Sequence, residues 1–99
     1  MTGTIIHPDG SMSSSKIRIP WVLKLNSYEL YLNDRLYLLF YDASSRDSNK
    51  VVSKIIGRSI YGPVIVLQKH NYQYRSPSVD EIRSLSGAEL KQRDGCTIL

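Results

Sequence analysis

The feature of this sequence that most restricts its fold is a run of alternating residues near the N-terminus. Apolar side chains occupy every second position from Ile17 to Leu25, and most of the residues between them are Lys, Arg or Pro. A period of two is typical of a β-strand with one buried face. Pro20 lies inside the run and cannot donate a backbone hydrogen bond, so we expect an edge strand or a bulge there.

Two further strands are expected after this one, over residues 28–32 and 36–41. Asn33-Asp34-Arg35 is expected to form the hairpin loop between them, although it lacks glycine. The second strand is apolar on both faces, which indicates a central or covered position. The three strands predict an antiparallel meander. Its aromatic residues are expected to make core and cross-strand contacts: Trp21, Tyr28, Tyr31, Tyr37 and Tyr41.

A helix is expected over residues 50–56, because Val51, Val52, Ile55 and Ile56 recur at the spacing of one helical face. The polar linker 42–49 before it ends in good capping residues, and Gly57 suits the C-terminal end. The β-branched side chains leave a strand as the competing assignment.

The remaining segments complete a small α+β domain. Residues 60–68 predict a buried fourth strand, beside either the first or the third, and residues 79–85 predict a short capped helix. Residues 1–15 are rich in Ser and Gly, which favours a flexible N-terminal tail. We therefore expect one α+β domain over residues 16–93. It would hold a small antiparallel meander of three to four strands, one covering helix and a short C-terminal helix, followed by an exposed tail at 94–99.

Composition narrows the classes of function. The chain of 99 residues carries a formal charge of +4, which draws a protein mildly toward nucleic acid or an anionic membrane. Its single cysteine allows neither an internal disulfide nor a four-cysteine zinc site, so a reducing compartment such as the cytoplasm fits best. His7 and His70 stand at no diagnostic metal spacing, and no catalytic motif is present. We expect no enzyme activity, metal, cofactor or small-molecule substrate.

The last four residues form the clearest functional motif. Cys96-Thr97-Ile98-Leu99 matches the C-a-a-X signal for prenylation, in which a terminal Leu favours geranylgeranyl over farnesyl. The thiolate of Cys96 would be the nucleophile, and the aliphatic Ile98 suits an apolar enzyme pocket. In a host with a prenyltransferase, the sequence predicts a lipoprotein modified at Cys96.

This tail resembles those of Rho-type GTPases and G-protein γ subunits, and the resemblance covers four residues. The rest of the chain has neither the phosphate-binding loop of the former nor the long helix of the latter. The resemblance implies that residues 97–99 are removed and that the new carboxylate of Cys96 is methylated. It implies processing and location, and no activity.

A membrane-bound form needs a second signal, because one prenyl chain binds membranes only marginally. Lys91 and Arg93 are candidates, but Glu89 and Asp94 offset them. Anchoring would then depend on the net charge of the domain or on a protein partner that holds the lipid.

A second candidate site is the basic and aromatic segment at 69–75. Cations between aromatic side chains can pair with phosphates and stack on bases. The candidate contacts with nucleic acid or a partner are Lys69, His70, Tyr72, Tyr74 and Arg75. The alternative is a loop or strand end whose tyrosines pack flat with their hydroxyl groups in water.

These features predict a small non-enzymatic adaptor or regulatory protein, cytoplasmic and peripherally attached to membranes through geranylgeranyl-Cys96. Such a protein would act on a protein partner. The alternatives are a small basic nucleic-acid-binding module and a subunit whose aromatic sheet face docks on a larger complex.

Overall fold

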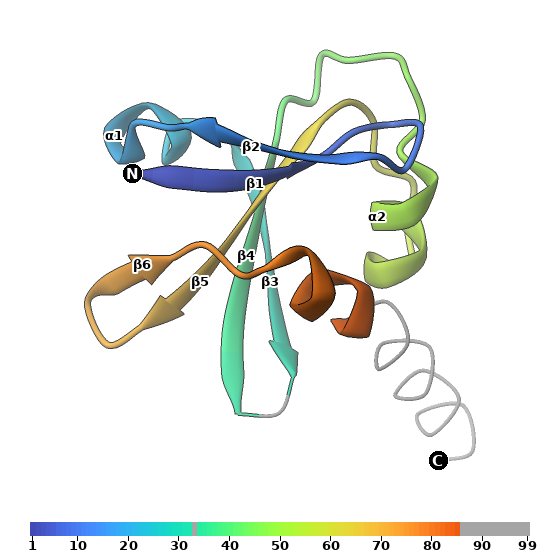
Figure 1. Cartoon of the computed structure of the whole chain (residues 1–99). Coiled ribbons are helices and arrows are strands. Elements are labelled where there is room, and N and C mark those ends of the chain that lie inside the picture. Colours follow the sequence, from blue (N-terminus) through green and yellow to red (C-terminus); the bar gives the residue numbers. More distant parts are fainter. Residues whose placement is uncertain (33, 86–99) are drawn as a thin grey trace.

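The structure, a computed structural model, describes residues 1–32 and 34–85 (Figure 1). Within these residues six strands form one antiparallel sheet in the order β2-β1-β5-β4-β3, with β6 paired to β5. The expected α+β class is confirmed, but the sheet has more strands than the three to four expected. The elements are β1 (Thr2–Ile6), β2 (Met12–Lys16), α1 (Ile19–Val22), β3 (Asn26–Leu32), β4 (Arg35–Tyr41), α2 (Lys50–Ile56), β5 (Val64–His70) and β6 (Gln73–Arg75).

The first residues, for which we expected a flexible tail, form the β1–β2 hairpin. β1 pairs with β2 on one side and with the central strand β5 on the other. The side chain of Ile6 is fully buried, and Thr4 Oγ1 donates to the carbonyl of Pro77 at 3.0 Å. The tail is therefore corrected to a hairpin. Its Ser-rich half is β2, an edge strand whose side chains are mostly exposed, so composition concealed the pairing.

The alternating run at 17–25 is not a strand, which also corrects the expected meander. β2 ends at Lys16, and the run contains the short helix α1. Pro20 lies in the first turn, where its missing N–H breaks no helical hydrogen bond. The N–H of Leu23 donates to the carbonyl of Ile19 at 3.0 Å. Val22 is the buried residue of α1, so the period of two did not mark a buried face.

The other elements follow the sequence more closely. β3 and β4 form the expected hairpin, and α2 is the helix expected at 50–56. Gly57 ends α2 in the left-handed conformation, with φ of 85°. Residues 79–85 are helical as expected. No helix in the described part of the chain is long and apolar enough to cross a membrane.

β5 is the central strand, and its position settles a choice that the sequence left open. One edge pairs with β4, the strand expected at 36–41, and β1 and β6 also pair with β5. Its first five residues, 64–68, are all buried. The segment at 69–75, for which a loop or a strand end was the alternative interpretation, completes β5, turns at residues 71–72 and forms β6.

The sheet has an apolar cluster on each face. The larger cluster includes α2, the helix at 79–85 and the β5 residues Val64 and Val66. The smaller one lies on the α1 side and includes Val22, Ile65 and Leu67. Figure 1 shows α2 and the helix at 79–85 away from α1, which stands at a corner of the molecule.

The expected aromatic packing is confirmed in part. Tyr37 is buried, and Tyr28 and Tyr41 are partly buried against the larger cluster. Trp21 and Tyr31, in contrast, are 56% and 66% exposed. These two side chains are therefore free to contact something other than the core.

Asn49 joins three segments through one buried side chain. Its Oδ1 accepts from the N–H of Val52 at 3.2 Å and so caps α2. Its Nδ2 donates to the carbonyls of Ile6 at 3.0 Å and Gly62 at 2.8 Å. Because the side chain is fully buried, each of these bonds lies away from competing water.

We predict that Asn49→Ala lowers the free energy of unfolding by about 3 kcal/mol, because it removes a helix cap and leaves buried carbonyls unpaired. Urea denaturation followed by circular dichroism measures the change. Asn49→Asp keeps the cap but loses both donors, so it should not restore stability. The exposed Asn26→Ala is the control and should be neutral. Full stability in Asn49→Asp would show that the cap alone matters.

Candidate functional site

The β5–β6 hairpin carries the basic and aromatic residues that the sequence singled out, but it divides them between two faces. Lys69 lies opposite Tyr74, and their side chains share the α1 side of the sheet, with Lys69 Nζ 5.9 Å from the ring centroid. His70 and Arg75 lie on the other side. Tyr72 is in the turn and is 97% exposed. The candidate residues therefore do not form one site.

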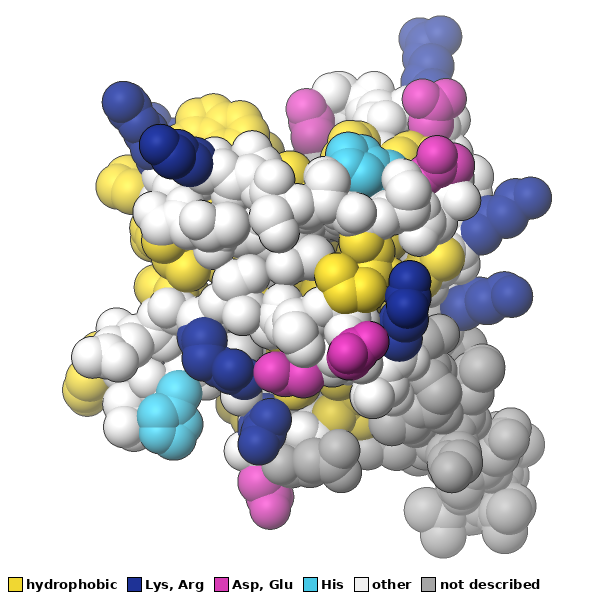
Figure 2. All heavy atoms as spheres, in the orientation of Figure 1, with side chains coloured by type: hydrophobic (Ala, Val, Ile, Leu, Met, Phe, Trp, Pro, Cys, Tyr) yellow, Lys and Arg dark blue, Asp and Glu magenta, His cyan; other side chains and the backbone are white. Residues whose placement is uncertain are grey.

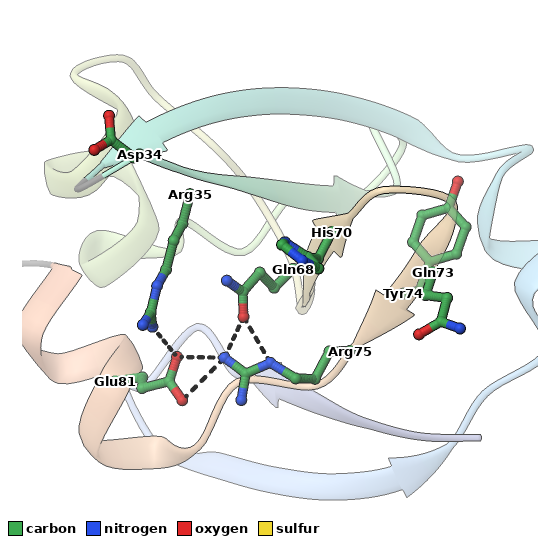
Figure 3. Close-up of a pocket in the computed structure, with 8 residues that line it drawn as sticks. All are labelled: Asp34, Arg35, Gln68, His70, Gln73, Tyr74, Arg75 and Glu81. Atoms are coloured by element: carbon green, nitrogen blue, oxygen red, sulfur yellow. Dashed lines mark hydrogen bonds and ion pairs between the residues drawn. The ribbon is translucent and has the colours of Figure 1, made fainter.

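His70 and Arg75 line a polar cleft of about 750 Å³ between the β5–β6 hairpin, the start of β4 and the helix at 79–85 (Figure 3). Arg75 Nε donates to Gln68 Oε1 at 2.7 Å, and Arg75 Nη2 also contacts that oxygen. Arg75 Nη2 further donates to Glu81 Oε2 at 3.1 Å. Sequence reasoning did not connect these residues, because they come from separate segments and share no spacing.

Glu81 lies between two guanidinium groups. Besides Arg75, its Oε2 is 3.8 Å from Nη1 of Arg35. Asp34 also lines the cleft, so the described lining holds two arginines and two carboxylates, and little net charge remains for a ligand. The arrangement links the helix at 79–85 to the sheet, and both arginines that the structure describes in the cleft are paired with Glu81.

A second row of side chains crosses the opposite face. Tyr31 lies opposite Leu36, Leu36 opposite Lys69, and Lys69 opposite Tyr74, across four strands. Directly opposite residues of antiparallel strands share a face. Tyr31 thus lies with Lys69 and Tyr74 on one face of the sheet. The sequence analysis did not group these three residues, because it assigned Tyr31 to the core.

A third surface surrounds α1, and we call it the α1 surface: the apolar residues Pro20, Trp21 and Leu23 with the cations Lys16, Arg18 and Lys24. All six are exposed, and Trp21 and Leu23 are 56% and 51% exposed. At the upper left of Figure 2, Lys or Arg side chains stand beside hydrophobic ones, where Figure 1 places α1.

Trp21 stands between two hollows. One is an apolar groove of about 460 Å³ that Ile17, Phe40 and Ile65 line, with Lys16 at its edge. The other, of about 580 Å³, is lined by Arg18 and Lys24 among others. The cations thus lie on both sides of the indole.

Asp42 is the acid that lines the apolar groove. Ser44 donates to Asp42 Oδ1 from its backbone N–H at 2.9 Å and from its hydroxyl at 2.7 Å. These bonds lower the pKa of Asp42 below its usual value. Glu29, opposite Leu38, is another acid on this face.

The predicted lipidation site, Cys96 with the motif at 96–99, lies outside the described residues. Comparison of the chain with protein-family models, curated proteins and solved structures gave no match. The function is therefore argued from the residues themselves.

We predict that Arg75 and Glu81 couple by no more than about 1 kcal/mol, because their side chains are 53% and 29% exposed and water screens the pair. A double-mutant cycle with Arg75→Met and Glu81→Gln, read by urea denaturation, measures the coupling. It should shrink in molar salt. A salt-insensitive coupling of several kcal/mol would contradict this account of the cleft.

Proposed function

We propose that this protein is a non-enzymatic adaptor, geranylgeranylated at Cys96 and peripherally associated with membranes, that acts on a protein partner. The observation that carries the proposal is the terminal motif Cys96-Thr97-Ile98-Leu99, which holds the sole cysteine of the chain. The motif is read only at a free chain end, so the proposal requires Leu99 to be the last residue in the native host.

The fold supports access to this motif. Leu85 is 5% exposed and belongs to the larger apolar cluster, so the sheet holds the chain up to this point. Cys96 follows eleven residues later, a length that spans at most about 40 Å when extended. That reach suffices for Cys96 to enter an enzyme pocket, and later a bilayer, without unfolding the sheet.

We predict that the protein purified from its own host carries one geranylgeranyl group and a methyl ester and lacks residues 97–99. Intact-mass spectrometry measures this directly. Cys96→Ser should retain the unmodified full-length mass, because no thiolate remains to be alkylated. An unmodified C-terminus in the wild-type protein would refute the proposal.

A second candidate function is binding of single-stranded nucleic acid. The observation that favours it is Tyr72, 97% exposed in the β5–β6 turn, near the row that contains Lys69 and Tyr74. Exposed aromatic rings beside cations stack on bases without sequence preference. Because Arg75 is paired with Glu81, this function would depend on Lys69 and the tyrosines.

If this second function holds, Tyr72→Ala weakens binding of a fluorescent oligothymidylate by about fivefold or more, the loss expected for one stacked base. Fluorescence anisotropy at low salt measures it, and added salt should also weaken binding. Tyr61→Ala, at another exposed tyrosine, is the matched control. Absence of binding at low salt would eliminate the nucleic-acid function.

A further inference from the structure

The α1 surface is a patch that neither the cores nor the polar cleft accounts for. Trp21 and Leu23 are more than half exposed on a helix of four residues, next to the exposed Pro20. Scattered apolar side chains are ordinary on a protein surface, whereas a cluster with a polar rim marks an interaction site. The chain buries only Val22 from this helix, so packing does not explain why it presents an indole to water.

The charged residues of the segment that forms this patch all have one sign. Residues 16–25 contain three cations and no acid. Lys16 lines the groove on one side of Trp21, and Arg18 and Lys24 line the hollow on the other. The acids of this face lie outside this stretch: Glu29 is in β3, and Asp42, which also lines the groove, directly follows β4. An indole with cations on both sides is complementary to a surface that is apolar within and anionic at its boundary.

We infer that the α1 surface docks on an anionic membrane, with Trp21 and Leu23 in the headgroup region and Lys16, Arg18 and Lys24 against lipid phosphates. Tryptophan favours this interface because its ring is apolar and its N–H can remain hydrated. The inference rests on the proposed function and deepens it: the surface supplies the second signal that a single prenyl chain requires.

The size and position of the surface favour a membrane over a protein partner. A stable protein interface buries about 800 Å² on each side and involves about twenty residues or more. The α1 surface is a short helix with its flanks, at a corner of the molecule (Figure 1). A small apolar projection ringed by cations can enter a headgroup layer directly, and each cation near an anionic surface strengthens binding by about fivefold.

The test uses the full chain expressed in bacteria without a prenyltransferase, so that Cys96 is unmodified. Trp21 is the only tryptophan, and its emission therefore reports on this surface alone. We expect a blue shift with vesicles of equal parts phosphatidylcholine and phosphatidylserine, and quenching by brominated lipid chains. Vesicles of phosphatidylcholine alone should give little shift, and added salt should reverse binding.

Variants locate the contact. Lys16→Ser with Lys24→Ser should weaken vesicle co-sedimentation by about 30-fold, and Leu23→Ser should weaken it further. Lys50→Ser with Lys54→Ser removes the same charge from exposed positions of α2 and is the matched control, expected to change binding less than about threefold. Equal losses in both pairs would show diffuse attraction by net charge and overturn the inference.

Two further outcomes would show that the α1 surface does not bind membranes and would overturn the inference. Unchanged Trp21 emission with anionic vesicles would exclude the membrane. A blue shift that grows with protein concentration without lipid would assign the surface to a second copy of the chain. Because the protein is unlipidated, these results do not depend on Cys96. If the protein from its native host has an unmodified mass, the proposed prenylation is refuted, but the inference that the α1 surface binds anionic vesicles is not affected.

Discussion

The whole structure depends on the burial of β5 on both of its faces. Val64 and Val66 point into one apolar cluster, and Ile65 and Leu67 point into the other. A strand in this position must have a covering layer on each side and a hydrogen-bonded neighbour at each edge. β1, β4 and β6 supply the neighbours. The helices supply the layers, unequally: α2 and the helix at 79–85 cover one face, and the short α1 covers part of the other.

The candidate surfaces differ because the helices cover the two faces of the sheet to different extents. On the side of the larger cluster, the helix at 79–85 packs through Ile82 and Leu85, and Glu81 pairs with two arginines. On the other side, the four-residue helix α1 is too short to cover a six-stranded sheet. Trp21 and Tyr31 are left exposed there. The side of the sheet with the thinner cover is therefore the side that offers apolar and aromatic groups to a membrane or another molecule.

Local patterns predicted the elements whose partners are near in sequence. The β3–β4 hairpin and α2 needed only apolar spacing, a capping residue and Gly57, which are all local signals. The prediction failed at residues 1–25, where partners are distant. Ile6 is opposite Val64, and no pattern within the first fifteen residues records that pairing. At the candidate site the same distinction holds: the segment at 69–75 was found from its composition, but its division between two faces followed only from the register of β5 and β6.

The sequence by itself determined an α+β chain with a central apolar strand, a capped helix at 50–56, a small excess of positive charge and a C-a-a-X motif at Cys96. These properties are local or compositional. Tertiary structure alone decided that the first residues complete the sheet and that Trp21 stands outside the core among three cations. The physical reason is that the alternating pattern shows which side chains are apolar, but it does not show which of them pack against distant residues of the chain. Pro20 lies in the first turn of a helix instead of a strand, and that helix buries Val22 and leaves the indole of Trp21 exposed.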